Sequence, residues 1–308
     1  MGRVTNISVV ITDLDNTLYD WLTPWAAYYN AILDTISPLI GVHRKDLAAE
    51  IQRVHAKYAT SEIPNIANHT PSIRHALEAG FPQKDIETCV CTAESLRRQQ
   101  QKLYPGVWKF LNMMRDSRIL VVGLTDSREW GTRQRIRALG LDGVLPCVYS
   151  QPDTVEGSRP SAEVFPLRTT THNAVDPTIG SKPNPALLHN ILRDLGVTPE
   201  QCLYIGDNLG RDIVMANTVG VFSAWAKYGD MKTNPFLPTL KELSHVSSAV
   251  VQEEHKRTQA LGTRPDVFLD GGLIDILDHV SFSPYHRACA VPTRRAADSS
   301  WLLDDHPR

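Results

Sequence analysis

The segment ISVVITDLDNT, residues 7–17, joins a run of β-branched apolar residues directly to two aspartates. The run Ile7–Thr12 is apolar on both faces, which is typical of a buried parallel strand. Asp13 and Asp15 follow at the carboxyl end of that strand, where open α/β sheets bind their ligands. Two carboxylates without a cation would be unfavourable there, so one interpretation is a Mg²⁺ site in which one carboxylate serves as nucleophile and the other as general acid and base. The alternative is an Asx-rich turn that only caps the strand, which is the more common meaning of a lone D-x-D.

Further short apolar runs recur along the chain and alternate with helical patterns. They are Ile119–Leu124, Val144–Tyr149, Cys202–Ile205, Gly220–Trp225 and Val267–Leu269. One helical pattern begins at Asn184-Pro185, follows a leucine and isoleucine stripe to Leu195 and ends at Gly196, with a cap at each end. Strands that alternate with helices predict an α/β fold, a Rossmann-like parallel sheet with helices on both faces.

Residues 21–104 differ from the rest because their patterns are wholly helical. The expected helices are Trp25–Ile36, Lys45–Tyr58, Ser72–Glu78 and Lys84–Leu103. A helical block of this length is too long for an ordinary crossover between two strands. We therefore expect an inserted all-helical domain at 21–104 within a discontinuous core at 1–20 and 105–283.

Three other segments stand out by composition. Residues 151–180 are rich in Pro, Thr, Ser and Asp, which predicts an extended surface loop. Residues 229–264 carry Asn-Pro and Leu-Pro turns before a polar helix-like piece, which indicates a second insertion. The tail at 284–308 has nothing to build a core from, so we expect it to be disordered.

Composition restricts the class of protein. The 308 residues have a formal net charge of −2 and are 42% hydrophobic, which argues against a strongly basic protein that binds nucleic acid polymers. No stretch is apolar for long enough to span a membrane. The five cysteines are scattered, and the C-x-C pair Cys89 and Cys91 lacks a second pair for a zinc site. We expect free thiols in a soluble, cytoplasmic protein.

Three more motifs follow strands or precede a helix. Thr125 ends an apolar run, and its hydroxyl with the freed backbone N–H groups of Asp126 and Ser127 suits a phosphate oxygen. Lys182 lies just before a helix, where a cation would stabilise bound phosphate. The stretch GDNLGRD, residues 206–212, again places carboxylates after a strand. Two of them have ordinary alternatives, because Thr-Asp-Ser is also a common helix N-cap and Lys182 could be a solvated loop lysine.

In this order, the four motifs resemble those of the haloacid dehalogenase (HAD) superfamily of phosphohydrolases. DLDNT matches its D-x-D-x-T motif, Thr125 its strand-then-Thr/Ser motif, Lys182 its lysine, and GDNLGRD its acidic motif. The set extends from Asp13 to Asp212, about two-thirds of the chain. The helical block lies where this superfamily places its C1 cap, which closes over the site and contacts the part of the substrate beyond the phosphate.

The resemblance implies a role for each motif residue. Asp13 would attack phosphorus and form an aspartyl-phosphate, while Asp15 would protonate the leaving alcohol and then activate water. An aspartate at this second position favours phosphatase over dehalogenase chemistry. Thr125, Asp126 and Lys182 would hold the phosphoryl oxygens, and Lys182 would also offset the repulsion between Asp13 and the phosphate.

The same resemblance implies the metal ligands. Mg²⁺ would be held by the Asp13 carboxylate, the backbone carbonyl of Asp15 and Asp207, with Asp212 as a further ligand or an outer-shell acid. The substrate would be a small phosphorylated metabolite: a nucleoside monophosphate, a sugar phosphate and phosphoglycolate all fit. A phosphomutase of the same superfamily, or a HAD-like binding or regulatory protein, are the alternatives. The intact motif set argues against the last. Neither substrate nor oligomeric state follows from the sequence.

Overall fold

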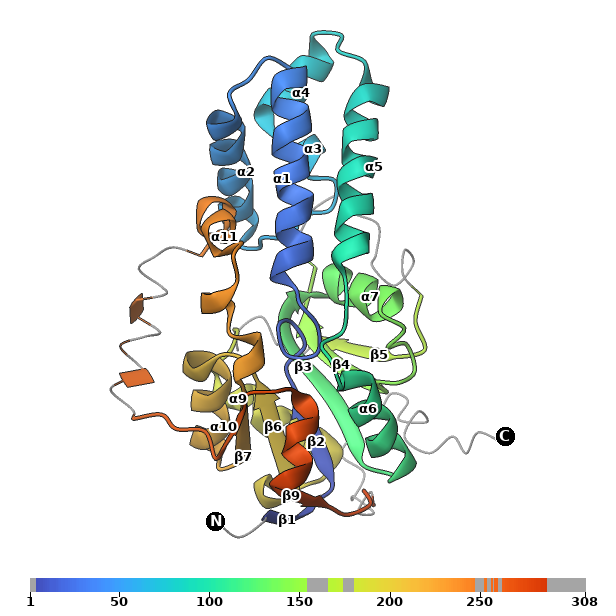
Figure 1. Ribbon diagram of the computed structural model, residues 1–308, viewed down its shortest axis with the longest axis vertical. Coiled ribbons are helices and arrows are strands. Elements are labelled where there is room, and N and C mark those ends of the chain that lie inside the picture. The colour runs from blue at the N-terminus through green and yellow to red at the C-terminus, as the bar shows by residue number, and fades with distance from the viewer. Residues whose placement is uncertain are drawn as a thin grey trace.

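The computed structural model describes residues 4–153, 166–173, 180–246 and 262–286, with residues 252, 253, 256, 258 and 259. Its centre is a seven-stranded sheet in which each neighbouring pair is parallel, in the order β5-β4-β3-β2-β6-β7-β8 (Figure 1). The strands are β2 (Val9–Thr12), β3 (Leu120–Arg128), β4 (Cys147–Gln151), β5 (Thr170–Asn173), β6 (Cys202–Gly206), β7 (Phe222–Ala226) and β8 (Val267–Leu269).

The register of the central strands places the motifs together. Thr12 at the end of β2 pairs with Gly123 of β3 on one side and with Ile205 of β6 on the other. The residues that follow these positions therefore emerge at the same edge of the sheet. β2 is buried along its whole length, as its apolar residues on both faces predict.

Helices cover both faces of the sheet. α6 (Val107–Asp116) and α7 (Glu129–Ala138) contribute to the apolar cluster on one face. α9 (Pro185–Leu195) and α10 (Val214–Val219) contribute to the cluster on the other. The Asn184 side chain caps α9 by accepting a hydrogen bond from Ala186 N, and Gly196 ends it in the left-handed conformation. The predicted α/β core is confirmed.

Between β2 and α6, where every residue is described, the structure has five helices, which we call the cap. These are α1 (Leu22–Leu39), α2 (Arg44–Tyr58), α3 (Ile66–His69), α4 (Pro71–Glu78) and α5 (Gln83–Gln100). They bury a separate apolar cluster, and Figure 1 shows them stacked beyond one end of the sheet. The cap is therefore a helical unit inserted after the first strand of the sheet. Its aromatic residues Trp25 and Tyr29 are buried in that cluster.

A segment after β7 also reaches the cap. It runs through η3 (Lys227–Gly229), η4 (Met231–Thr233) and α11 (Leu237–Leu243), and α11 packs against α2 (Figure 1). We call residues 227–246 the strap. The carbonyl of Leu243 accepts a hydrogen bond from His55 Nδ1 at 2.6 Å, and Leu243 joins the apolar cluster of the cap. The strap thus connects core and cap independently of the two chain crossings at α1 and α5.

We expect the strap to loosen in acid because His55 is neutral when bound. Its Nδ1–H donates to Leu243, and its Nε2 accepts from the Tyr29 hydroxyl at 2.9 Å. Burial lowers the pKa of His55 to about 4. The unfolded chain therefore takes up a proton between pH 6.5 and 4 that the folded chain does not, and stability falls as the pH drops through this range, by up to about 3 kcal/mol.

The measurement is the free energy of unfolding of the wild type and of His55→Gln from pH 7.5 to 4.5. The variant should be less stable at pH 7.5, with a smaller further loss towards acid. An equal acid loss in both proteins would show that His55 does not cause the dependence.

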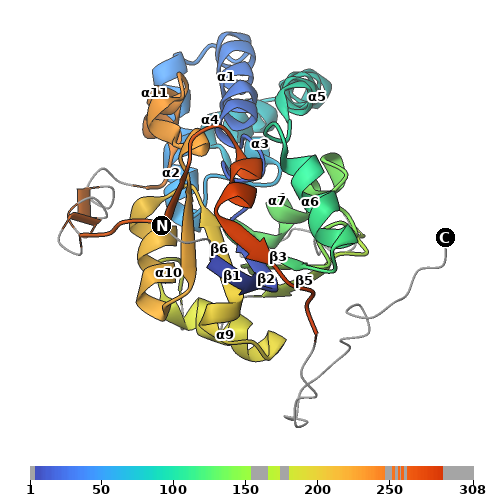
Figure 2. The ribbon, with the colours of Figure 1, turned by 60° about the horizontal axis from the view of Figure 1, so that its bottom comes forward.

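Two sheet elements depart from the sequence prediction. Thr170–Asn173, within the predicted loop 151–180, forms the edge strand β5 on β4. The polar sequence TTHN lacks the apolar pattern that predicts a buried strand, because an edge strand buries little surface. The predicted strand Ile7–Thr12 is divided, because Ile7 belongs to β1 (Val4–Ile7), which pairs with β9 (Val280–Phe282) in a separate sheet (Figure 2).

Parts of the other sequence predictions lie outside the described residues. This holds for residues 154–165 and 174–179 of the predicted loop, for most of 247–261, and for the predicted tail beyond residue 286. Within the described part of the chain, every helix is too short or too polar to cross a bilayer. The remaining short helices are η1 (Pro199–Gln201), η2 (Leu209–Ile213) and η5 (Leu273–Asp278).

Candidate active site

The candidate site lies where β2, β3 and β6 end beside one another. Asp13 directly follows β2, and its backbone N–H donates to the carbonyl of Ile205 in β6 at 2.8 Å. Its side chain is buried, and Oδ2 accepts a hydrogen bond from the Thr17 hydroxyl at 3.0 Å. The D-x-D-x-T motif thus folds back on itself, so that its threonine fixes the orientation of its first aspartate.

Lys182 joins two of the sequence motifs. Its Nζ donates to Asp13 Oδ1 and, at 2.7 Å, to Asp212 Oδ1, and the lysine is almost completely buried. Although burial alone would lower it, the pKa of Lys182 lies well above its ordinary value because Asp13 and Asp212 stabilise the ammonium. The alternative of a solvated loop lysine is therefore wrong.

Asp212 is held by three donors. Its Oδ1 accepts from Lys182 and from the Tyr204 hydroxyl at 2.8 Å, and its Oδ2 accepts from the backbone N–H of Asn208 at 3.0 Å. A Cβ atom at Gly206 would overlap the Asp212 side chain. The glycine that ends β6 is thus required for the close approach of this carboxylate to the strand.

Asp13, Asp207 and Asp212 form an acidic cluster in which one oxygen of each lies within 4.8 Å of the others. In the part of the chain that the structure describes, this is the group of acidic, His or Cys side chains that could hold a metal. Burial raises the pKa of Asp207 well above its usual range, with repulsion from Asp13 and Asp212. Hard carboxylate oxygens and an excess of negative charge fit a divalent cation such as Mg²⁺.

Asp15 points toward hydroxyl groups at the end of β3. Its Oδ2 accepts hydrogen bonds from Thr125 Oγ1 at 3.3 Å and from Ser127 Oγ at 2.5 Å. Its Oδ1 lies 3.1 Å from Nε of Arg135 in α7. The second aspartate therefore has its own set of partners, which differ from Lys182 and the acidic cluster.

Asp126 does not present its carboxylate to the site. Its Oδ2 pairs with Arg211, and its Oδ1 accepts from the backbone N–H of Lys182 at 3.1 Å. A carboxylate repels phosphate, so a contribution of Asp126 to phosphate binding is limited to its backbone N–H. Its side chain instead fixes the loop that carries Lys182 against the end of β3.

Sequence reasoning missed four side chains that the fold brings to the motifs. Tyr204 and Ser127 had a usable signal, since they lie within or beside predicted motif strands. Arg135 and Glu62 had none, because Arg135 is one of several charged residues in α7 and Glu62 is a lone charged residue in the segment between α2 and α3. Cys89, Cys91, Cys147 and Cys202 are free thiols away from the acidic cluster.

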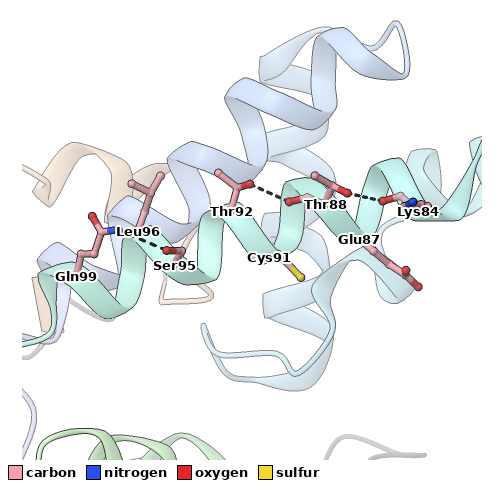
Figure 3. A pocket seen from close by; sticks show the side chains of 8 residues that line it. All are labelled: Lys84, Glu87, Thr88, Cys91, Thr92, Ser95, Leu96 and Gln99. Atoms are coloured by element: carbon pink, nitrogen blue, oxygen red, sulfur yellow. Dashed lines mark hydrogen bonds between the residues drawn. The ribbon is translucent and has the colours of Figure 1, made fainter.

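A surface hollow on the cap lies apart from these residues. Figure 3 shows that its lining consists of eight side chains between Lys84 and Gln99, all from α5. None of the four motifs contributes to it. The candidate site is therefore the sheet edge, and the hollow is a groove along one helix.

The fold and site together define a class: a Rossmann-like α/β protein with a helical cap and an aspartate–lysine–aspartate centre at the end of a parallel sheet. The family model for haloacid dehalogenase-like hydrolases matches residues 7–220, which include all four motifs and the cap. The chain belongs to this family, as its motifs predict.

Two curated relatives are glyceraldehyde 3-phosphate phosphatases. The protein of Pyrococcus abyssi is 24% identical over 225 residues, which cover 72% of this chain and 82% of the relative. That of Methanopyrus kandleri is 25% identical over 233 residues, which cover 73% and 88%. A solved structure, the 2-haloacid dehalogenase of Pseudomonas syringae, is 17% identical, covers 88% of this chain and 98% of its own, and has a TM-score of 0.47. The phosphatase relatives agree with the chemistry predicted from Asp15.

Proposed function

We propose that this protein is a Mg²⁺-dependent phosphatase that hydrolyses a small phosphorylated metabolite through an aspartyl-phosphate on Asp13. One observation carries the proposal. The Lys182 ammonium bridges Asp13 and Asp212, while Asp15 faces the Thr125 hydroxyl a short distance along the same sheet edge. A nucleophile beside a cation and a separate acid is the arrangement that phosphoryl transfer needs.

The metal would be held by Asp13, Asp207 and the backbone carbonyl of Asp15, with Asp212 as a further ligand or an outer-shell acid. When bound, it would neutralise charge on the phosphoryl oxygens and on the carboxylates around them. The indole of Trp225 donates to the Asp207 carbonyl at 2.7 Å, which holds the backbone of this ligand in place.

In the first half-reaction, a carboxylate oxygen of Asp13 would attack phosphorus as the bond to the leaving oxygen breaks. Asp15 would give its proton to that oxygen, and Lys182 and Thr125 would bind the phosphoryl oxygens. In the second half-reaction, Asp15 would take a proton from water, whose oxygen attacks phosphorus and releases Asp13 and inorganic phosphate. The catalytic residues are returned to their starting states.

The cap would select the substrate by contacting the part beyond the phosphate, since the helices after β2 cover the carboxyl ends of the strands. The curated relatives act on glyceraldehyde 3-phosphate, a three-carbon ester. We include it with the classes that the sequence suggests: a nucleoside monophosphate, a sugar phosphate and phosphoglycolate. All four are alkyl phosphates whose leaving oxygen needs a proton.

The first experiment measures phosphate release by the purified protein from these four esters, with Mg²⁺ and with EDTA. Release that requires Mg²⁺ is expected, and the preferred ester identifies the substrate class. If no ester releases phosphate, transfer of ³²P from a sugar bisphosphate to a second sugar would identify a mutase. The absence of both activities would contradict the proposal and favour a binding protein.

Replacement of Asp207 by alanine should raise the Mg²⁺ concentration for half-maximal activity by about tenfold or more, because one carboxylate ligand is lost. The titration compares Asp207→Ala with Asp270→Ala, which removes an exposed carboxylate paired with Lys227. An unchanged half-maximal concentration in Asp207→Ala would exclude it as a ligand.

A further inference from the structure

Arg135 in α7 is buried between two carboxylates from different parts of the chain. Its side chain is 4% exposed, and its Nε lies 3.1 Å from Asp15 Oδ1. Its Nη1 pairs with Glu62 Oε1. Asp15 belongs to the sheet-edge motif, whereas Glu62 belongs to the cap. One guanidinium therefore joins the proposed acid and base to the cap.

Ser127 makes a second connection between the same two carboxylates. Its hydroxyl oxygen lies 2.5 Å from Asp15 Oδ2 and 3.4 Å from Glu62 Oε2. The indole of Trp21 donates to Glu62 Oε1 at 3.1 Å. Glu62 is thus held by groups from the core and from the start of the cap. One residue, Ser127, separates its carboxylate from that of Asp15.

The cap segment that carries Glu62 is itself anchored. The carbonyl of Ser61 accepts from the Trp25 indole at 2.7 Å, and the Ser61 hydroxyl lies 2.8 Å from Nδ1 of His245 in the strap. A Cβ at Gly131 in α7 would lie 2.7 Å from Glu62 Oε2, so the absence of a side chain there leaves space for the carboxylate. Cap, strap and α7 together determine where Glu62 lies.

The guanidinium is not fully satisfied by these contacts. Its Nε donates to the Tyr19 hydroxyl at 3.1 Å, and its contact with Asp15 Oδ1 is an ion pair and not a hydrogen bond. Among the described residues, Arg135 Nη2 and Asp15 Oδ1 are buried without a hydrogen-bond partner. A buried ion pair adds little stability on average, because desolvation offsets the attraction. A buried arginine with an unused donor beside the proposed acid is therefore poorly explained by stability alone.

We propose that Arg135 and Glu62 are positioning residues for Asp15. Arg135 orients the Asp15 carboxylate toward the leaving oxygen, and Glu62 orients Arg135 only while the cap is seated on the core. The pair transfers no proton during the reaction, because arginine stays protonated throughout. Asp15 gives its proton to the leaving oxygen and regains one from water. This inference rests on the proposed phosphatase function and assigns the residues that link its acid and base to the cap.

The test uses two kinds of ester. Alkyl phosphates need a proton on the leaving oxygen, whereas p-nitrophenyl phosphate releases a stable anion without one. Loss of orientation of Asp15 should therefore reduce turnover of the alkyl ester much more than that of the aryl ester. A general structural defect would reduce both alike.

Three variants perturb the pair. Arg135→Lys keeps the charge but cannot contact both carboxylates as a planar fork. Glu62→Gln removes the charge of the cap partner. Gly131→Ala crowds Glu62 Oε2 at 2.7 Å and, less closely, Arg135 Nη1 at 3.2 Å without altering a polar side chain. Arg133→Lys is the matched control, since Arg133 is buried in the same helix but pairs with Glu129.

We expect Arg135→Lys to lower kcat on the best alkyl ester of the panel by about 100-fold and on p-nitrophenyl phosphate by less than about threefold, within the range of general acid catalysis. Glu62→Gln and Gly131→Ala should show the same selectivity at about tenfold. The Arg135→Lys/Glu62→Gln double variant should be no worse than Arg135→Lys, because both act through one contact. Arg133→Lys should not change the ratio of the two rates.

Equal losses on both esters, or fully additive losses in the double variant, would overturn the positioning role while leaving the phosphatase function intact. Unchanged selectivity in both Glu62→Gln and Gly131→Ala would overturn the link to the cap. A wild type that hydrolyses neither ester would overturn the proposed function, and the inference with it.

Discussion

Asp13→Asn is expected to reduce turnover on the order of 10⁴-fold or more, because the amide cannot form the phosphoryl bond that the carboxylate forms. The fold should tolerate this change. Asparagine is close in size, can still accept from the Thr17 hydroxyl, and leaves Lys182 its contact with Asp212. Loss of activity with retained structure is therefore the signature of a nucleophile at this position.

The pH dependence of stability sharpens the test. Burial raises the pKa of Asp13 to about 7, against the opposing effect of Lys182. The folded state then binds a proton between pH 4 and 7 that the unfolded chain has lost, so this carboxyl makes the wild type less stable as the pH rises. In EDTA, the melting temperature of Asp13→Asn relative to wild type should therefore increase between pH 4 and 7.

Asp20→Asn provides the control for Asp13→Asn, because Asp20 lies in the same loop and accepts only a local hydrogen bond from Thr23 N among its described contacts. It should retain nearly full activity. Activity of Asp13→Asn within tenfold of wild type would remove Asp13 as the nucleophile. Equal inactivation of both variants would indicate damage to the loop instead.

Lys182→Met should lower kcat/KM by about 10³-fold, because the ammonium is the cation that the structure places against the nucleophile. It should also lower the free energy of unfolding at pH 8 in EDTA by about 3 kcal/mol, since Asp13 and Asp212 are left buried without a counter-charge. The stability deficit should shrink at pH 5, because the carboxylates without their cation take up protons more readily.

Lys227→Met is the control, since Lys227 is half exposed and pairs with Asp270 at the surface. Its kcat/KM and stability should remain near wild type. If Lys182→Met retained its kcat/KM, a role in phosphate binding would be excluded. If its stability deficit were the same at pH 5 and pH 8, the loss would come from packing and not from charge.

Most of the core was predictable because local patterns define it. The strand Cys202–Ile205 and the helix after Asn184 appear where apolar runs and caps predicted them. The edge strand of the sheet and the ends of helices were less predictable. β5 is polar, and the predicted helix Lys84–Leu103 ends at Gln100, after which Leu103 bridges Tyr19. Such ends depend on contacts with distant segments, which no local pattern records.

The candidate site divides in the same way. The resemblance of the motifs to those of the HAD superfamily implied that Asp13, Lys182 and Asp207 are partners, and the fold places Asp13 and Lys182 in contact and Asp207 in the acidic cluster. The side-chain orientation of Asp126 was not predictable. Its carboxylate turns to Arg211, 85 residues later in the sequence.

The parallel sheet was predictable from the sequence, because strands that are apolar on both faces and the polar residues at their ends are local patterns. The family and the members of the acidic centre followed from the resemblance of these motifs to those of the HAD superfamily. Only the tertiary structure decided that the strap reaches the cap through His55, and that Glu62 and Arg135 lie beside Asp15. A single charged residue, in a helix as Arg135 or in a connecting segment as Glu62, belongs to no sequence pattern. The significance of such residues comes from burial and from the partners that folding gives them.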